Sequence, residues 1–581
     1  MSHAPFARRR AVNLLEFYAD PRSGAWEEVG YRPFPSGVPS VGRAQASPAE
    51  KRLADLRPEY DVVVVGSGAG GGVAARVLAA AGASVLIVER GGWIDRDAPA
   101  LTHLHNHRLT IGGDGTSPDG HPRAVPRDDG TEEELVPSDL RYRNNAIVVG
   151  GGTRFFGAQA WRFRPDDFRM ATKYGVPAGS ALADWPIAYD DLEPFYDKVE
   201  WALGVAGEAS AGAAGRRRGY PMPPFPLSLE GARLAAAAGT LGWTTTRVPL
   251  MINTEPRDGR PACIRCGFCV GFPCPVDAKN GTETTALPSA VANGAHLLSN
   301  AQVVRISDTG EVDVVQRGSQ RRVRAGRIAV AGGAVETARL LMVSGLGNEW
   351  VGDCLQGHTY AGAYGRFDDV VVDGLGPGPS IATLDFAHDN DGFVGGGMLA
   401  NDFVKLPALF FVWALPPDAP LRGEDARRAV AEAYLRTGHV MGPVQEVSTR
   451  AARVRLASSV KDAAGVPVAR LEGVQHPEDL RGARRLAARA QEWLDAAGAT
   501  TTWASVPTHA VLSGGQHQAG TVRMADTPAA GAADPMGRVW GCERVYVVDG
   551  SLHVTNGCVN PALTIMALAW RTAEHLAATS T

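Results

Sequence analysis

The stretch that decides the fold is Tyr60–Glu89, which reads YDVVVVGSGAGGGVAARVLAAAGASVLIVE. Tyr60–Val65 is rich in β-branched residues, as expected of a strand that is buried on both faces. The glycine-rich Gly66–Gly71 follows, and then a run of small residues, Val73–Ala81, that predicts a helix. Ser84–Glu89 is a second apolar strand. This order of strand, helix and strand predicts a βαβ unit within a parallel sheet.

The glycines of this unit have the spacing Gly66-x-Gly68-x-x-Gly71. The first permits a tight turn, the second lets a pyrophosphate approach the backbone, and the third lets the helix and strand pack closely. The helix N-terminus favours the anion, and Glu89 can accept hydrogen bonds from a ribose diol. The unit therefore predicts a dinucleotide site. A second glycine cluster, Val148–Gly152, favours a long FAD held at both ends.

The C-terminal region carries the candidate chemistry. His517 is a candidate general base, because imidazole titrates near neutral pH. Val545–Val548 predicts another buried strand. Asn560-Pro561 precedes a predicted helix, Leu563–Ala578, and makes a favourable N-cap for it. The positive end of that helix can stabilise a flavin that becomes anionic on reduction.

These motifs together resemble the glucose–methanol–choline (GMC) oxidoreductase family over residues 58–581. Besides the first glycine cluster and Glu89, the resemblance rests on Val149–Thr153, Ala331–Thr337, His517–Thr521 and Asp549–Pro561. It implies that His517 accepts the hydroxyl proton of the substrate while a hydride leaves carbon for flavin N5, and that Asn560 hydrogen-bonds the substrate oxygen. The positions that it assigns to FAD binding are Gly66, Ser67, Gly68, Ala69, Gly70, Gly71, Glu89, Arg90, Gly150, Gly151, Gly152, Thr153, Gly157, Ala158, Gln159, Val303, Ala331, Asp549, Gly550, Asn560 and Pro561.

Residues 161–168, 184–194 and 356–358 resemble the sugar-oxidising branch of the family, which includes gluconate dehydrogenases, bacterial pyranose oxidases and actinobacterial glycoside 3-oxidases. The resemblance implies oxidation of a secondary hydroxyl of a pyranose or of a C- or O-glycoside to a ketone, with oxygen or a diffusible acceptor taking the electrons. Some pyranose oxidases attach FAD through a histidine where this chain has Phe155. FAD is therefore expected to be non-covalent.

Three other functions stay open at this point. The first is oxidation of a primary hydroxyl on an aminoglycoside or another natural-product sugar. The second is a gluconate-type dehydrogenase that passes electrons through an iron–sulfur cluster to a partner. The third is a non-catalytic FAD-binding protein, against which the intact pair of His517 and Asn560 argues.

Two histidines compete with His517 as the base, namely His553, which lies close to Asp549 in sequence, and His509. The histidines for which no catalytic role is expected are His103, His105, His107, His358 and His388. The first three of these alternate, as metal ligands on one face of a strand would, but their polar surroundings favour a solvated loop. The last two are expected to border the substrate domain.

The cysteines Cys263, Cys266, Cys269 and Cys274 nearly match a ferredoxin run, but four residues rather than three precede the last one. Prolines on both sides of Cys274 restrict its backbone, and free cysteine is a common buried residue. A structural loop is therefore favoured over an iron–sulfur cluster or a zinc site. No metal is expected, and FAD is expected to be the only redox centre.

Composition narrows the class of protein. A length of 581 residues is too great for one compact core and predicts two large domains or more. The hydrophobic fraction of 45% is enough to bury a sizeable core. The net charge of −4 argues against a nucleic-acid binder. No apolar run reaches the length of a membrane span, and acidic residues interrupt any secretion signal near the start, so a cytoplasmic protein is expected. Seven cysteines are too few for a disulfide scaffold.

The expected fold is α/β (α+β, two-domain), with a Rossmann-like FAD-binding domain and a discontinuous substrate domain on an antiparallel or mixed sheet. The predicted segments are an N-terminal extension at 1–57, an FAD-binding domain at 58–165, 230–355 and 506–581, and a substrate-binding domain at 166–229 and 356–505. Residues 94–145 are predicted as loops and Ala408–Leu415 as a strand, whereas Pro477–Ala497 predicts a long helix.

Overall fold

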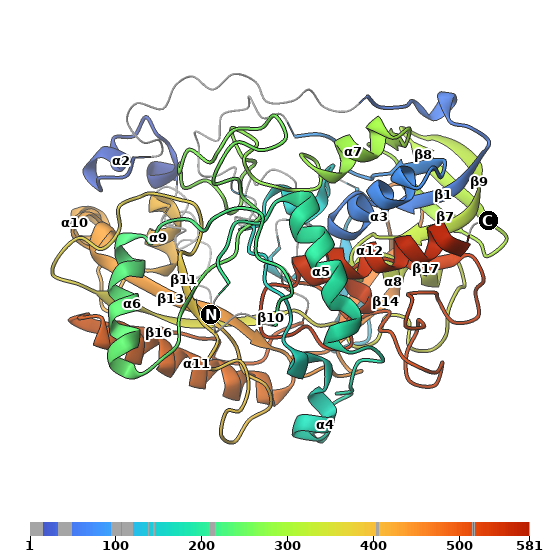
Figure 1. Cartoon of the computed structure of the whole chain (residues 1–581). Coiled ribbons are helices and arrows are strands. Elements are labelled where there is room, and N and C mark those ends of the chain that lie inside the picture. Colours follow the sequence, from blue (N-terminus) through green and yellow to red (C-terminus); the bar gives the residue numbers. More distant parts are fainter. Residues whose placement is uncertain are drawn as a thin grey trace.

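Three sheets with helices around them make up the fold (Figure 1). The structure is a computed structural model. It describes residues 16–32, 49–94, 106, 120–137, 139–142, 146–209, 215–402, 406–513, 515 and 517–579. The predicted mixed α/β class is confirmed.

The first sheet is mostly parallel and contains the motif that decides the fold. Its strand order is β6 (His296–Leu298), β2 (Val85–Val88), β1 (Glu59–Val65), β9 (Ser319–Val330), β8 (Glu311–Gln316) and β7 (Gln302–Ile306), and β17 (Val545–Val547) also pairs with β9. β1 lies between β2 and β9 and is parallel to both. Val62, Val63 and Val64 are fully buried, as the continuous β-branched run predicts.

Helices from distant parts of the chain cover this sheet. α3 (Ala69–Ala80) follows β1 directly and packs against α7 (Ala286–Ala292) and the C-terminal α12 (Ala562–Thr579). Figure 1 shows the blue α3 beside the red α12. α5 (Tyr189–Leu203) packs on α12, and α8 (Ala334–Val343) follows β9. The C-terminus thus completes the unit that the first motif begins.

The second sheet is antiparallel throughout. Its strand order is β16 (Thr501–Ser505), β10 (His358–Arg366), β13 (Thr437–Gln445), β12 (Leu399–Asn401), β11 (Ile381–Thr383) and β5 (Thr246–Arg247). The long helix α11 (Pro477–Ala496) packs on β10 and β13, and on α6 (Leu229–Leu241). Trp493, on the buried face of α11, donates a hydrogen bond to the Leu234 carbonyl (2.8 Å).

The third sheet has the order β14 (Arg453–Lys461), β15 (Pro467–Glu472), β3 (Arg123–Pro126) and β4 (Glu132–Leu135). β3 and β4 correct the prediction of loops over residues 94–145. These strands are short and charged, so they lack the apolar pattern that would have revealed them. β3 pairs with β15, far along the chain, and β4 pairs with β3, so this contact supplies the order that local sequence does not.

The segment predicted as a strand over Ala408–Leu415 is a helix, α9 (Pro407–Trp413). Pro407 suits the first turn of a helix, and a short apolar run cannot by itself be assigned to strand or helix. Phe410 stacks edge-on against Tyr434, which follows α10 (Gly423–Ala433). Within the predicted extension 1–57, Tyr18 stacks on Phe411 of α9, close to α2 (Ala25–Glu28).

The remaining helices are short: α4 (Met170–Tyr174) and the 3₁₀ turns η1 (Leu53–Asp55), η3 (Leu140–Tyr142), η4 (Gly151–Arg154), η5 (Pro165–Phe168), η6 (Tyr434–Arg436) and η7 (Gly550–Leu552). The predicted FAD segment 230–355 contributes β6 to β9 to the first sheet and β5 to the second. The domain boundaries stay a prediction. None of the described helices has the length and apolar character needed to span a membrane.

Candidate active site

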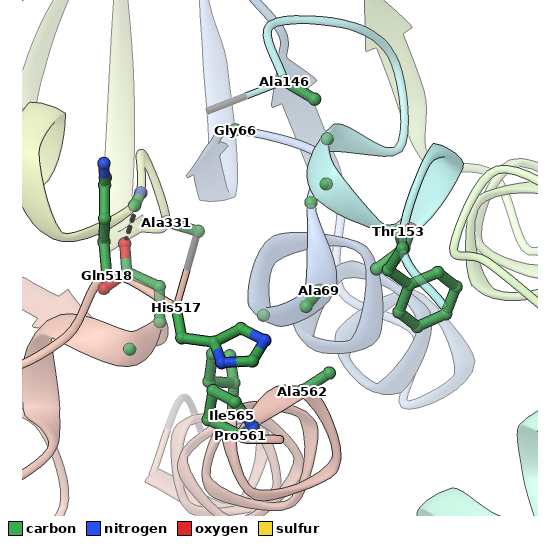
Figure 2. Close-up of a pocket in the computed structure, with 18 of the residues that line it drawn as sticks. Gly66, Ala69, Ala146, Thr153, Ala331, His517, Gln518, Pro561, Ala562 and Ile565 are labelled. Carbon is green, nitrogen blue, oxygen red and sulfur yellow. Dashed lines mark hydrogen bonds between the residues drawn. The ribbon is translucent and has the colours of Figure 1, made fainter. Parts of the chain in front are cut away.

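A cavity of about 370 Å³ lies between the first and second sheets. Its wall combines the ends of β1, β2 and β9, the starts of α3 and α12, and parts of β10, β12 and β13. The predicted site residues that line it are Gly66, Gly68, Ala69, Gly70, Glu89, Arg90, Gly151, Gly152, Thr153, Gly157, Ala158, Gln159, Val303, Ala331, His517, Asp549, Gly550, Asn560 and Pro561. Figure 2 shows His517 beside the start of α12 at Pro561 and Ala562, with Ala69 of α3 near it.

Three predicted residues, Ser67, Gly71 and Gly150, support the wall from behind instead of lining the cavity. The Ser67 hydroxyl donates to Glu89 Oε2 (2.7 Å) and accepts from the backbone N–H of Gly150 (3.0 Å). A Cβ at Gly71 would lie 2.0 Å from the carbonyl oxygen of Gly66. The two glycine clusters are therefore joined through one serine.

Glycine is required at two positions of the wall. Gly66 has a φ of 101°, and a Cβ there would lie 2.4 Å from the Ala331 carbonyl oxygen. Gly151 has a φ of 53°, and its Cβ would lie 2.9 Å from the Cα of Gly68. Both the left-handed backbone and the close approach exclude a side chain. Bare backbone therefore forms this part of the wall, next to the positive end of α3.

Glu89 directly follows β2 and is buried. Its Oε2 accepts from the Ser67 backbone N–H (2.9 Å) as well as from the Ser67 hydroxyl, and its Oε1 accepts from the Gly91 N–H (2.8 Å). Burial raises the pKa of this carboxyl, while these hydrogen bonds oppose the rise. The three donors hold the carboxyl group at the cavity, where it can also accept from a ligand.

Asp549 connects the C-terminal motif to the first sheet. Its Oδ2 accepts from the Thr337 hydroxyl (2.6 Å) and the Gly333 N–H (2.8 Å), and its Oδ1 accepts from the Ser551 N–H (2.9 Å). Burial raises the pKa of Asp549, again against these hydrogen bonds. The carboxyl group thereby fixes η7 against the loop between β9 and α8.

The predicted catalytic pair lies at the other end of the cavity. His517 Nε2 is 3.4 Å from Asn560 Nδ2, which also donates to the Tyr360 hydroxyl (3.3 Å). Asn560 Oδ1 is buried and has no hydrogen-bond partner within the described chain. The structure therefore brings the imidazole, the amide and a phenol to one point of the wall, where one substrate oxygen can contact them.

Sequence analysis gave no role to His358 and did not single out Tyr360 or Asn556, yet all three belong to this group. Tyr360 lies in the wall, His358 Nδ1 is 2.8 Å from His517 Nδ1, and Asn556 donates to the His517 carbonyl (2.8 Å). One signal for two of them was present. His358 and Tyr360 are two residues apart in one strand, so they lie on the same face of β10.

The rival bases do not line the cavity. His553 is fully buried between Phe163 and Trp185, and its Nδ1 bonds Asn556 Oδ1 (3.0 Å). Burial lowers the pKa of His553 to about 4. His509 is exposed and contacts its neighbour Thr508. Among the three candidates, His517 alone reaches the wall.

The four clustered cysteines have free thiols. No three of their sulfur atoms lie within 4.8 Å of one another in the described chain, whereas a tetrahedral zinc site with Zn–S bonds of about 2.3 Å needs sulfur atoms roughly 3.8 Å apart. The loop is tied to the cavity wall by the buried Lys279, which donates to the carbonyls of Cys269 (2.7 Å) and Phe156 (3.3 Å). The histidines at 103, 105 and 107 lie outside the described residues.

One group of possible metal donors does converge among the described residues. Atoms of Asp167, His388 and Cys558 lie within 4.8 Å of one another, and all three residues are buried. His388 Nε2 bonds Asp167 Oδ1 (3.1 Å), and the Tyr174 hydroxyl bonds His388 Nδ1 (3.1 Å). These groups satisfy one another, so they form a hydrogen-bonded cluster behind the loop that leads to Asn560.

Two GMC oxidoreductase family models match the chain, one over residues 180–360 and the other over residues 448–569. The chain belongs to the GMC oxidoreductase family. This GMC oxidoreductase is 31% identical to "Paromamine 6'-oxidase" of Streptomyces fradiae, with 91% of this chain and 94% of that protein covered. It is 30% identical to "6'''-hydroxyparomomycin C oxidase" of Streptomyces lividus (89% and 92%) and 29% identical to "2-methyl-1,2-propanediol dehydrogenase" of Mycolicibacterium austroafricanum (89% and 95%).

Solved structures share the fold of this GMC oxidoreductase. Pyridoxine 4-oxidase from Mesorbium loti superimposes with a TM-score of 0.56 at 17% identity, covering 89% of this chain and 98% of that one. A formate oxidase gives a TM-score of 0.56 at 14% identity, covering 92% and 99%. The predicted two-domain fold and FAD as cofactor are confirmed, and the chain is an oxidoreductase of alcohol groups.

The cavity fits FAD at both ends. The glycine backbone and the start of α3 would hold the pyrophosphate, and Glu89 would accept from the ribose. At the other end α12 begins at Ala562, and its positive end lies at the cavity. The buried, unpartnered Oδ1 of Asn560 is available there to an N–H of a ligand.

Proposed function

We propose that this GMC oxidoreductase oxidises a hydroxyl group of a pyranose or glycoside, with His517 as the base. The observation that carries the proposal is the wall at the start of α12. There His517 Nε2 and Asn560 Nδ2 lie 3.4 Å apart, which lets both contact one substrate oxygen. FAD, when bound, supplies the hydride acceptor.

The chain's own residues do the rest of the chemistry. His517 removes the hydroxyl proton as the carbon gives up a hydride, so two electrons leave with the hydride and a C=O bond forms. Asn560 donates to the substrate oxygen and orients the C–H bond. The acceptor that later removes the two electrons is oxygen or a diffusible molecule, which is part of the proposal.

The rest of the substrate end suits a sugar ring. Tyr360, Asn401 and Met441 of the second sheet, together with Met398 just before β12, line the wall. Such a wall offers apolar contact for ring carbons together with a few polar groups for hydroxyls, which is the usual composition of a small-molecule site. A secondary hydroxyl, oxidised to a ketone, is the first candidate for the reacting group.

The comparisons favour a second candidate, a primary hydroxyl of an aminoglycoside. Two of the similar proteins are named as a paromamine oxidase and a hydroxyparomomycin oxidase. At the substrate end the wall contains one carboxylate among the described residues, Asp402, which lies 3.3 Å from His439. A polycationic substrate would favour several carboxylates, so the neutral sugar is preferred here.

Anaerobic reduction of the holoenzyme tests both candidates. Methyl glucosides, an aryl C-glycoside and paromamine are each added, and bleaching of the flavin absorbance is followed; the products are then mapped by NMR. A ketone on a neutral pyranoside supports the first candidate, and an aldehyde on paromamine supports the second. If no sugar bleaches the flavin, the proposed function is wrong and the substrate is an alcohol outside this panel.

A further inference from the structure

His358 contacts His517 from the side opposite the substrate. It is the first residue of β10 and is buried. Its Nδ1 lies 2.8 Å from Nδ1 of His517, and the two rings are nearly perpendicular, at 87°. Its Nε2 lies 3.0 Å from the carbonyl oxygen of Gly557. His358 therefore has a hydrogen-bond partner at each ring nitrogen.

The Gly557 contact fixes where His358 carries its proton. A carbonyl oxygen only accepts hydrogen bonds, so His358 Nε2 must be the donor. Burial lowers the pKa of His358 to about 4, so the ring is neutral at pH 7 and its Nδ1 has a lone pair. The other titratable groups that face the ring are Asp167 and His553.

The protonation of His358 decides which ring nitrogen of His517 carries the proton. His358 Nδ1 can only accept, so His517 Nδ1 must carry the hydrogen, and the lone pair of His517 is on Nε2. The Asn560 contact agrees independently, because an amide Nδ2 only donates and faces that same Nε2 at 3.4 Å. We propose that His358 is a positioning residue that holds His517 in the tautomer whose Nε2 can accept a substrate proton.

The loop that contains Asn556 and Gly557 holds the rings of His358 and His517 in position. Asn556 donates from one amide group to the carbonyls of His517 (2.8 Å) and Gly357 (3.1 Å), and the next residue, Gly557, supplies the carbonyl for His358. The hydrogen-bond chain ends at that carbonyl, which cannot take up a proton. His358 thus orients His517 without relaying its proton onward.

The tautomer can be measured without any substrate. The holoenzyme is labelled with ¹⁵N-histidine, and long-range ¹H–¹⁵N spectra are recorded at pH 7, with the His517 ring assigned by its loss in His517→Ala. The expected result is a protonated Nδ1 and an unprotonated Nε2 on His517. A protonated Nε2 would overturn the proposal whether or not the proposed function holds.

A matched pair of variants tests the effect on rate, and this part rests on the proposed function. The amide of Asn in His358→Asn occupies the place of Nδ1 and keeps an acceptor for His517. The amide of Gln in His358→Gln reaches the place of Nε2 and keeps the Gly557 contact but offers His517 no acceptor. The rate of flavin reduction by methyl glucoside or paromamine should be at least tenfold higher in His358→Asn than in His358→Gln. We expect the rate of His358→Gln to be on the order of 10²-fold lower than that of the parent enzyme.

The pH profile separates positioning from a merely structural effect. An acceptor on Nδ1–H favours the protonated ring, so its loss in His358→Gln should move the acidic limb of the reduction profile to lower pH, with His358→Asn close to the parent. Equal rates in the two variants, or a slower His358→Gln with an unmoved limb, would overturn the proposal. If His517→Ala itself reduces as fast as the parent, the fault lies instead with the proposed function.

Discussion

The two ends of the cavity are built in different ways. At the nucleotide end, the wall is backbone from two glycine motifs that are each continuous in the chain, and Gly66 and Gly151 are there because a Cβ would collide with neighbouring backbone. At the substrate end, the wall is side chains such as Tyr360 and Met441, which come from separate strands of the second sheet. An end made of backbone is encoded locally, whereas an end made of side chains depends on the register of distant strands.

The buried ionisable groups differ in the same way. The nucleotide end holds Glu89 and Asp549, whose pKa values burial raises. The substrate end is backed by His358 and His553, whose pKa values burial lowers to about 4. As the pH falls, the raised pKa values of the carboxyls stabilise the folded protein, whereas the lowered pKa values of the histidines destabilise it. The two ends therefore have opposite effects on how stability depends on pH.

The largest effect should come from the substrate end. His517→Ala removes the base, so flavin reduction by the sugar found in the panel should slow by about 10²–10⁴-fold, with FAD still bound. Stopped-flow absorbance measures the rate, and exposed His509→Ala is the matched control. A loss below about tenfold would show that His517 is not the base.

A smaller effect is expected at the nucleotide end. Glu89→Ala removes the acceptor for a ribose hydroxyl and leaves the Ser67 N–H without its carboxylate. At about 1.5–3 kcal/mol for a hydrogen bond to a charged group, the Kd for FAD should rise by about 10–100-fold. Titration of apoprotein with FAD measures it, and the exposed Glu134→Ala is the control. Unchanged affinity would contradict the role given to Glu89.

The buried histidine His553 should make the stability of the folded protein depend on pH. An unfolded histidine takes up a proton near pH 6.5, but buried His553 does so only near pH 4, so lowering the pH from 7 to 5 should cost about 2 kcal/mol through this group. In urea unfolding, His553→Gln should lose about that much less stability than the parent over the same range. Parallel pH profiles of the two proteins would show that folding does not lower the pKa of His553.

No covalent flavin is expected at either end. Phe155, in the wall, stands where covalent relatives place a histidine. Acid precipitation of the holoenzyme should therefore release all the yellow colour into the supernatant. Flavin that stays with the precipitated chain would reveal an attachment through another residue.

The last prediction concerns the cysteine loop, which we expect to bind no metal. Cys263, Cys266, Cys269 and Cys274 have free thiols whose sulfur atoms do not gather as zinc requires. Protein purified without air should contain neither iron nor acid-labile sulfide. Three or four irons per chain, with an absorbance near 400 nm that dithionite bleaches separately from the flavin, would instead indicate an electron relay beside the cavity.

Sequence predicts the fold best where structure is continuous in the chain. The run Tyr60–Glu89 specified β1, α3 and β2, because a buried strand and a tight glycine turn leave few alternatives. Sequence-based prediction failed for β3 and β4, because β3 is ordered by pairing with the distant β15 and β4 by pairing with β3. It also failed for α9, where the apolar run fits helix and strand equally and packing against Tyr18 and Tyr434 decides.

The same limit applies to the candidate site. His517 and Asn560 belong to motifs that sequence displays, and the structure places their side chains together. His358 lies in the segment 356–358, which resembles the sugar-oxidising branch, but that segment predicts no contact with His517, and Tyr360 belongs to no such motif. What places both beside His517 is the position of β10 next to the loop of Asn556 and Gly557. That neighbourhood arises only when the second sheet meets the C-terminal segment.

The first sheet and its helices join two segments that lie far apart in the chain. β17 pairs with β9, and α12 packs against α3, so the last strand and helix of the chain complete the fold that residues 59–80 begin. Since Asp549, Asn560 and Pro561 form part of the wall, the cavity is complete only when this segment has packed against residues 59–80. A folding intermediate in which β17 and α12 are not yet in place has the glycine turn but not the whole wall, so packing of the C-terminal segment and tight binding of FAD are coupled.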